Sequence, residues 1–355
     1  MGVKVIALYL PQYHSIKENS EWWGEGFTDW VNVKKARKIS KNQYQPRKPM
    51  GDNYYDLLNI EVMVSQAKIA KEYGVYGFCY YHYWFNGKLL LESPLENMLT
   101  NKRVSIPFCL SWANEPWTRA WDGGEREILM RQEYGAEDDW VAHFNYLVKF
   151  FKDERYIKIN NMPILVIYRT ESIENVNKMV DVWNRMAMEN GFSGIYLVET
   201  LNSFQRSSFV DNSKAMFEFE PMYTISKQRR NLLSRIYHRF LMKRFGGLTI
   251  RDYDSVWGDI LSRSRKISDK KLFLGAFVDW DNTPRKGNRG LYIRGMTANK
   301  FRYYFSRQVS KAKNLGSEYI FLNAWNEWAE GTYLEPDDKY GYGILEAVKE
   351  SVLGA

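Results

Sequence analysis

The sequence is poor in cysteine: only Cys79 and Cys109 occur among 355 residues. Both lie inside apolar, strand-like runs, where a buried free thiol is the usual state of a cysteine. Two cysteines cannot form a disulfide framework, which excludes the small disulfide-stabilised secreted proteins. The composition instead fits a reducing compartment such as the cytoplasm.

Long hydrophobic runs are also missing. No apolar stretch approaches the ~18 residues that a membrane-spanning helix needs, so we expect no transmembrane segment. The opening MGVKVIALYLPQYH holds an apolar run that ends at Pro11 and is too short for a signal peptide. Gly2 is not followed by Ser or Thr at position 6, so the myristoylation pattern fails. We expect a cytoplasmic protein, with membrane association as the alternative.

Histidine is scarce, and motifs for nucleotides are absent. The four histidines, His14, His82, His143 and His238, show no metal-ligand spacing. No G-x-G-x-x-G follows an apolar run, and no Walker A pattern occurs. We therefore expect neither a metal site nor a cofactor. His143 lies in a helical pattern and is interpreted as structural, whereas His82 is a candidate for a position in a cleft.

Acidic residues are fewer than basic ones, which gives a formal net charge of +8. A nucleic-acid-binding protein would gather its basic residues on one face, but here they are scattered, and we expect no nucleic-acid partner. The densest cluster spans residues 227–251, where Leu, Ile and Phe recur at helical spacing, and it predicts a solvated helical hairpin. A surface for peripheral contact with anionic lipid or a lipid-linked glycan is the alternative.

Short apolar runs are abundant, and each is followed by a polar loop. Near-continuous hydrophobicity is typical of parallel strands that are covered on both faces. The eight predicted strands are Val3–Leu10, Val75–Tyr81, Ile106–Trp112, Pro163–Arg169, Gly194–Glu199, Ala215–Phe219, Leu272–Val278 and Tyr319–Ala324.

Amphipathic helical patterns lie between these runs. They cover Leu58–Tyr73, Asp138–Lys152, Ile173–Asn190, Thr297–Lys313 and Gly341–Val352. Eight alternating units predict an α/β fold, a (β/α)8 TIM barrel, rather than an open sheet. No linker or repeat divides the chain, so we expect one domain over residues 1–355, with long insertions at 11–56 and 220–268.

Aromatic residues make up 16% of the chain, with 13 Trp, 25 Tyr and 19 Phe. Some of this excess must fill the core. Several Trp, however, stand in polar, Gly-rich stretches, where a flat ring suits the apolar C–H face of a sugar. The pattern therefore favours a carbohydrate partner.

In a β/α barrel the active site lies at the carboxyl ends of the strands, so the polar and aromatic residues there are candidates for the site. The predicted substrate-binding residues are Tyr13, His14, Trp23, His82, Trp84, Trp112, Asn114, Glu115, Trp117, Arg119, Glu218, Asp281, Arg285, Trp325, Asn326 and Trp328.

Glu327 and Glu330, in WNEWAEG after the last run, are the predicted catalytic residues. Cleavage of a glycosidic bond needs one group that protonates the leaving oxygen and another that handles the positive charge at the anomeric carbon. Two carboxyls three residues apart on a turn can reach one sugar ring. Each can also shift the pKa of the other, which separates acid from base.

Several sequence blocks carry a family resemblance. FLNAWNEWAEGTYLEP, YLPQYH, EWWGEGFTDW, YQPR, SWANEPWTRAWDG, FEFEPMY and DWDNTPR span nearly the whole chain. Together they resemble the WbsX-like family of bacterial surface-polysaccharide gene clusters. That family is similar to glycoside hydrolase family 99, the endo-acting α-mannosidases, mainly through NEWAEGT.

The resemblance implies a metal-independent, retaining barrel enzyme that acts on a surface polysaccharide or its precursor. By this resemblance Glu327 would deprotonate the 2-hydroxyl of the substrate, which then attacks the anomeric carbon. Glu330 would be the general acid/base. WbsX-like proteins are often labelled glycosyltransferases because of their genomic setting, so transfer remains an alternative to hydrolysis.

Three further interpretations stay open. Asn114-Glu115-Pro116 is similar to the acid/base signature of a large glycosidase clan, but it follows the third predicted strand rather than the fourth. Asp279-Trp280-Asp281 is a D-x-D pattern that could hold a metal and the phosphates of a sugar nucleotide. A non-catalytic glycan-binding protein would use the aromatics without the paired glutamates.

Overall fold

The computed structural model describes residues 2–119, 124–227, 247–264 and 269–354. Eight parallel strands follow one another around a closed barrel, because β1 pairs with both β14 and β2. The barrel strands are β1 (Lys4–Tyr9), β2 (Val75–Phe85), β4 (Phe108–Trp112), β8 (Met162–Ile167), β9 (Tyr196–Leu201), β10 (Ala215–Glu218), β12 (Lys271–Phe277) and β14 (Tyr319–Asn323). Every predicted strand and the TIM-barrel fold are confirmed.

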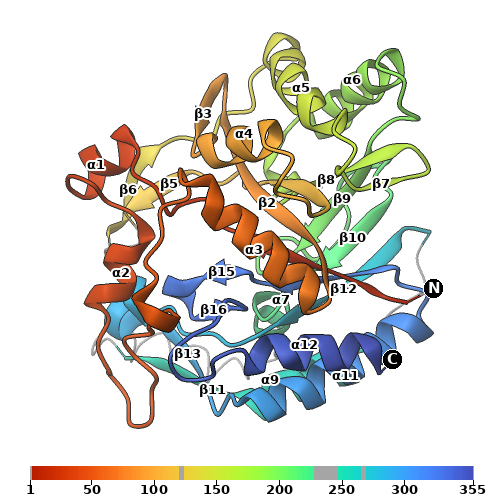
Figure 1. Cartoon of the computed structure of the whole chain (residues 1–355). Coiled ribbons are helices and arrows are strands. Elements are labelled where there is room, and N and C mark those ends of the chain that lie inside the picture. The colour runs from red at the N-terminus through yellow and green to blue at the C-terminus, as the bar shows by residue number, and fades with distance from the viewer. Residues whose placement is uncertain (1, 120–123, 228–246, 265–268, 355) are drawn as a thin grey trace, which may run out of the picture.

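In the described parts of the chain, seven helices follow these strands and surround the barrel (Figure 1). They are α3 (Ile60–Glu72), α4 (Ser93–Thr100), α5 (Glu137–Phe151), α6 (Val176–Glu189), α9 (Tyr253–Ser262), α11 (Ala298–Asn314) and α12 (Gly343–Leu353). The five predicted helices are all confirmed, with ends shifted by a few residues. The connection from β9 to β10, residues 202–214, contains no helix.

Long loops after the strands carry smaller elements. Before α3 lie α1 (Lys17–Trp23), α2 (Asp29–Lys35) and the 3₁₀ turn η1 (Met50–Asp52). In the middle of the chain lie β3 (Lys88–Leu90), the pair β5 (Trp117–Arg119) and β6 (Gly124–Met130), β7 (Lys158–Ile159), η2 (Thr170–Ser172) and α7 (Met222–Lys227). Later come the pair β11 (Thr249–Asp252) and β13 (Leu291–Arg294), α10 (Thr283–Lys286), η3 (Gly287–Arg289), β15 (Asn326–Glu327), η4 (Trp328–Glu330) and β16 (Thr332–Tyr333).

Aromatic side chains fill much of the layer between the barrel and its helices. Alternate residues of a strand point to opposite faces, so Tyr9, Phe78 and Tyr80 all lie on the outer face of the barrel wall. The ring of Tyr9 lies 5.2 Å from that of Phe78 and 4.5 Å from that of Tyr80. The Tyr9 hydroxyl donates to Gln66 of α3 at 2.6 Å, which ties the helix to the strand. Part of the aromatic excess therefore serves the core.

No helix in the described parts of the chain is long and apolar enough to cross a lipid bilayer. The predicted helical hairpin at 227–251 lies mostly outside the described residues. Of its basic residues, Lys227 ends α7 and Arg251 lies in β11.

Candidate active site

The segment after β14 carries both predicted catalytic residues at the carboxyl end of the barrel. Asn326 fixes this segment to the end of β1, because its amide donates to the Leu10 carbonyl at 3.0 Å and accepts from the Leu10 N–H at 2.8 Å. Glu327 then pairs with Thr332 in the short β15–β16 ribbon. The Glu330 carbonyl accepts from the Asp281 N–H at 2.7 Å, so both ends of the turn are held.

Arg285, on α10, joins three carboxylates. Its guanidinium donates to Asp29 at 2.7 Å, to Glu330 at 2.9 Å and to Glu327 at 3.3 Å. The predicted site residue Arg285 and the predicted pair thus lie in one cluster. Asp29, at the start of α2, completes it and also accepts from the Asn32 amide at 3.0 Å. Sequence reasoning did not select Asp29, although the block EWWGEGFTDW that contains it was noted.

Burial separates the two glutamates. The Glu327 side chain is 8% exposed and that of Glu330 is 23% exposed. Burial raises the pKa of Glu327 to about 8; Arg285 opposes the shift, and Glu330 and Asp29 add to it. A carboxyl with a pKa near neutrality can accept and release a proton at physiological pH. The cluster therefore offers a proton-transfer group in the interior and a second carboxyl group nearer to solvent.

Tyrosines of β2 surround this pair. Tyr81 and Tyr83 are buried, and burial together with the nearby charge of Glu327 raises the pKa of Tyr81 well above its usual value. The pKa of Tyr83 is likewise raised, first by burial and then by Glu327. Both residues have odd numbers on β2 and so face the same side of the strand. The phenols remain neutral donors beside the carboxylates.

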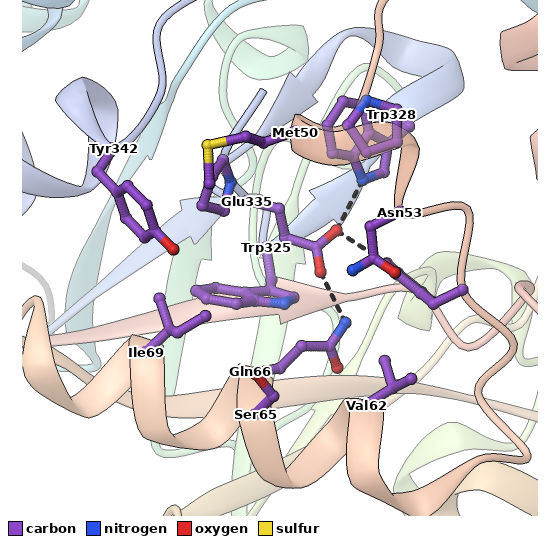
Figure 2. Close-up of a pocket in the computed structure, with 13 residues that line it drawn as sticks. Met50, Asn53, Val62, Ser65, Gln66, Ile69, Trp325, Trp328, Glu335 and Tyr342 are labelled. Atoms are coloured by element: carbon purple, nitrogen blue, oxygen red, sulfur yellow. Dashed lines mark hydrogen bonds between the residues drawn. The ribbon is translucent and has the colours of Figure 1, made fainter. Parts of the chain in front are cut away.

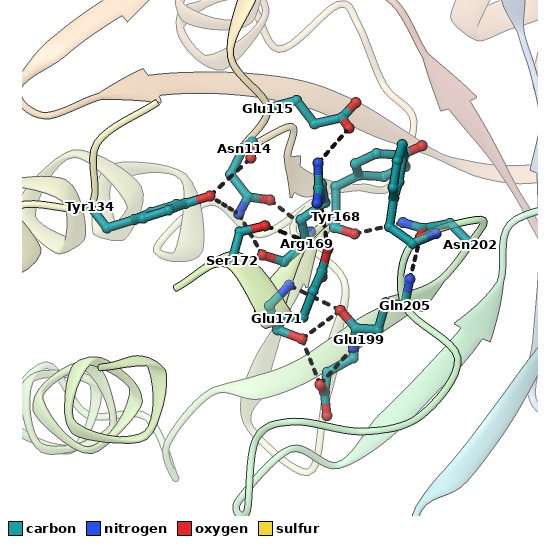
Figure 3. Close-up of polar contacts among 12 residues, drawn as sticks. Asn114, Glu115, Tyr134, Tyr168, Arg169, Glu171, Ser172, Glu199, Asn202 and Gln205 are labelled. Carbon is teal, nitrogen blue, oxygen red and sulfur yellow. Dashed lines mark hydrogen bonds and ion pairs between the residues drawn. The ribbon is translucent and has the colours of Figure 1, made fainter. Parts of the chain in front are cut away.

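A second polar group lies where β4, β8 and β9 end (Figure 3). Arg169 pairs with Glu171 at 2.7 Å and with the predicted site residue Glu115 at 3.4 Å. Burial raises the pKa of Glu115, Arg169 opposes the shift, and the charge of Glu330 contributes to it. The Asn114 amide donates to the Arg169 carbonyl at 2.8 Å and accepts from the Arg169 N–H. Asn114 thus holds the loop, while Glu115 faces the mouth after the third barrel strand.

Three predicted site residues turn away from the mouth. The His82 Nε2 atom lies 2.9 Å from the Nε2 atom of His143 on α5. Burial lowers the pKa of His82 to about 3. The Trp84 indole donates to Asp139 at 3.0 Å, and the Trp112 indole donates to the Trp84 carbonyl at 3.2 Å. His82 and Trp84 have even numbers on β2, so they face the helices while Tyr81 and Tyr83 face the site. His82 is therefore not in the cleft.

Trp325 and Trp328 are also buried, and both lie above α3 (Figure 2). They line a cavity of about 230 Å³ beside α3. The Trp328 indole donates to Glu335 at 2.7 Å, and Glu335 also accepts from Tyr55 at 2.8 Å and from Gln66 at 2.6 Å. In this structure the two indoles pack and anchor the segment that carries Glu327 and Glu330.

Four other predicted site residues, at the end of β10 and in the loops after β1 and β12, contact side chains or carbonyl groups of this same chain. The Tyr13 hydroxyl donates to the Asn326 carbonyl at 2.5 Å, and His14 contacts the Pro11 carbonyl at 2.9 Å. Glu218 pairs with Arg263 at 2.9 Å. Asp281 is fully buried and accepts from Gln43, Gln45 and Thr283.

The first carboxylate of the D-x-D pattern also contacts a protein side chain, since Asp279 pairs with buried Arg47 at 2.7 Å. Within the described ranges, no three His, Cys, Asp or Glu side chains are grouped as metal ligands.

Trp23, Trp117 and Arg119 gather beside the mouth, near α1 and α2. Trp23 and Arg119 line a second cavity of about 280 Å³, together with Trp22, Phe27, Val31, Asn32 and Lys35. We call it the α2 pocket. Trp117 lies behind it, 5.6 Å from Trp22 and 5.4 Å from Tyr83 between ring centroids.

Comparisons place the chain among known proteins. The family described as Glycosyltransferase WbsX matches residues 5–348. The uncharacterized protein WxcX of two strains of Xanthomonas campestris pv. campestris is 34% identical over 99% of this chain. The chain spans about half the length of these relatives, 50% in each case.

Two solved structures share the fold. A glycoside hydrolase-like protein has a TM-score of 0.61 at 14% identity and covers 99% of this chain and 94% of its own. The GH99 endo-alpha-mannosidase from Bacteroides thetaiotaomicron has a TM-score of 0.56 at 12% identity, with 99% and 96% covered. These likenesses show the barrel fold, and the sequence match shows that the chain belongs to the WbsX glycosyltransferase family.

Proposed function

We propose that the chain is a glycan-processing enzyme, a retaining, endo-acting glycoside hydrolase of α-mannosidase-like type. Its substrate would be a bacterial surface polysaccharide or its precursor. The observation that carries the proposal is the cluster in which Arg285 contacts Glu327, Glu330 and Asp29 at the carboxyl end of the barrel. Two carboxyls of unequal burial on one turn suit the two proton transfers of glycoside cleavage.

In this mechanism the ionised form of Glu327, which its raised pKa makes the major form only above about pH 8, accepts the proton of the 2-hydroxyl as the 2-oxygen bonds to the anomeric carbon. Glu330 donates a proton to the leaving oxygen as the glycosidic bond breaks. Water then opens the 1,2-anhydro ring at the anomeric carbon: it gives a proton to Glu330, and Glu327 returns its proton to the 2-oxygen. Two inversions at one carbon give net retention. Arg285 would hold both carboxyls in place through these steps.

The test is to incubate the protein with the polysaccharide produced by its own gene cluster and to measure chain length. Shortened chains whose first product keeps the anomeric configuration by NMR are expected. Activity that disappears with a chelator, or that requires a sugar nucleotide, would contradict the hydrolytic mechanism.

Transfer to an acceptor hydroxyl is the second candidate, because the matching family is described as a glycosyltransferase. The same two carboxyls could serve it, with a sugar hydroxyl in the place of water. Mass spectrometry of the products separates the candidates, since transfer gives chains that are longer than the donor fragment. A third candidate, a glycan-binding protein without catalysis, predicts that Glu330→Gln changes no product, because no product forms.

A further inference from the structure

The α2 pocket has the composition of a sugar subsite with a positive charge. Trp22 and Trp23 are half-buried and meet edge to face at 5.4 Å, and Trp23 packs on Phe27 at 5.1 Å. Val31, 43% exposed, completes the apolar wall. A half-exposed indole beside an open cavity can cover the C–H face of a sugar ring. Neutral sugars need no cation beside such a ring.

Two cations nevertheless line this pocket. Lys35 is exposed at the end of α2, and no described acidic side chain pairs with it. Arg119 donates to the Trp22 carbonyl at 3.2 Å and pairs with the exposed Glu127 at 2.9 Å, which orients its guanidinium at the pocket. The chain continues from α2 with exposed Arg37 and Lys38, which add positive charge close to Lys35 along the chain.

The pocket is continuous with the proposed catalytic cluster through α2. Asp29 and Asn32 are three residues apart, as are Asn32 and Lys35, so each pair lies side by side along α2. Asp29 contacts Arg285, Asn32 donates to Asp29, and Asn32 and Lys35 line the pocket. Six residues of helix rise about 9 Å, so a glycan bound at Glu327 and Glu330 can extend into the pocket.

We propose that the α2 pocket is a subsite for an anionic sugar residue, one that bears a carboxylate or a phosphate group. This inference rests on the proposed function, because it names the class of glycan that would reach the catalytic pair. Trp22 and Trp23 contact the ring, and the Lys35 ammonium and the Arg119 guanidinium contact the anionic group. The acidic residue would be one or two sugar units away from the bond that is cleaved.

The experiment is a titration of the intrinsic tryptophan fluorescence of the whole chain with two matched pairs of probes. One pair is a phosphorylated mannopentaose and the same sugar after dephosphorylation. The other is tetragalacturonate and its carboxyl-reduced form. We expect each anionic probe to bind about three to ten times more tightly than its neutral partner. If the anionic probe binds more tightly in only one pair, the anion of that pair is the one that the pocket prefers: phosphate for mannopentaose, carboxylate for tetragalacturonate.

Variants assign this preference to the pocket. Lys35→Gln should remove most of it, Lys35→Arg should retain it, and Trp23→Ala should weaken both members of each pair. Lys68→Gln is the matched control, an exposed helical lysine on α3 that should behave like the wild type. Raising the ionic strength from about 0.1 M to about 1 M shortens the Debye length from about 10 Å to about 3 Å and should reduce the preference.

Equal affinity for charged and neutral probes, no binding of any probe, or equal effects of Lys35→Gln and Lys68→Gln would overturn the inference. These measurements need no turnover. A chain that binds anionic glycans without cleaving them would contradict the proposed function alone. Cleavage that ignores the charge of the glycan would contradict the subsite alone.

Discussion

Two buried glutamates flank one short segment, and their surroundings differ. Glu327 faces the barrel mouth and shares Arg285 with Asp29 and Glu330. Glu335 lies on the opposite side and accepts from three neutral donors, the side chains of Trp328, Tyr55 and Gln66. Burial raises the pKa of both, to about 8 for Glu327 and about 7 for Glu335.

The comparison shows that burial raises the pKa of a carboxyl at the mouth and of one beside α3 alike, so burial alone does not mark Glu327 as the candidate. Glu335 accepts from three fixed donors of the protein and lines the cavity beside α3, so it exchanges its proton away from any substrate held by Glu327 and Glu330. Glu327 shares its cation with two other carboxylates, one of which is partly exposed at the mouth. In the proposed mechanism Glu327 can therefore exchange a proton with a bound substrate. A change in the protonation of Glu335 would instead disturb its hydrogen bond to Trp328 and the packing of that indole.

The largest expected effect is on catalysis. Glu330→Gln should lower the rate by a factor on the order of 10²–10⁴, because the leaving oxygen loses its general acid, and activated substrates with a good leaving group should restore the rate. Glu327→Gln should be poorly restored, because the attack step itself suffers. The test is to measure the cleavage rate of each variant on the ordinary glycan and on an activated substrate. Glu115→Gln, at the same mouth, is the matched control, and we expect a smaller loss of rate from it. Equal rates for all three variants would contradict the roles of Glu330 as general acid and of Glu327 as the base in the attack step.

Next is a contrast between two tryptophans. Trp328→Ala removes a fully buried indole and should lower the free energy of unfolding by about 3–5 kcal/mol. Trp23→Ala removes a half-buried indole and should weaken glycan binding by about 1–3 kcal/mol, with a smaller loss of stability. Urea unfolding and fluorescence titration of both variants check this. The same pattern in both variants would show that Trp23 is a core residue.

Glu335→Gln tests the anchoring side of the segment. The amide cannot accept from Trp328, Tyr55 and Gln66 at once without bringing two N–H groups together, so we expect a stability loss of about 1–3 kcal/mol. The loosened segment should lower kcat more than it raises KM, and the pH at which catalysis is optimal should not move. A shift of the pH profile as large as that of Glu327→Gln would place Glu335 in the chemistry instead.

The smallest expected effect is on the pH dependence of stability. The folded-state pKa of Glu335 is raised to about 7 from an ordinary value of 4.5, so the folded chain holds a proton that the unfolded chain releases. This contribution is fully present below pH 4.5 and is lost as the pH rises through about 7. Melting temperatures measured over this range should fall less steeply for Glu335→Gln than for the wild type. Parallel curves would contradict the raised pKa.

Much of the fold was predictable from short-range patterns. Each barrel strand is a near-continuous apolar run because both of its faces are covered, one by the barrel interior and one by a helix. The loop from β9 to β10, residues 202–214, has no helix, and none of the five predicted helices falls there. The position of Glu327 and Glu330 at the barrel mouth was predictable because they follow the last strand, and the ends of parallel strands meet at one face.

The site was predicted less well than the fold. His82, Trp84 and Trp112 follow or end barrel strands, as site residues do, but their side chains point toward the helices. The alternation of β2 required that His82 and Tyr81 face opposite sides, but it did not decide which of them faces inward. Trp325 and Trp328 lie in the same motif as Glu327 and Glu330, yet the turn of the chain directs them toward α3.

The sequence by itself determined the eight-stranded barrel, its order and the position of the glutamate pair, because hydrophobic periodicity and strand ends are local properties. Only the tertiary structure brought Asp29, from the first loop, and Arg285, from the seventh, onto that pair. Asp29 and Arg285 lie far from the glutamate pair along the chain, so no local sequence pattern could predict that they contact it. The close contact of three carboxylates with one guanidinium arises only when separate loops pack over the barrel mouth and exclude water from the charges.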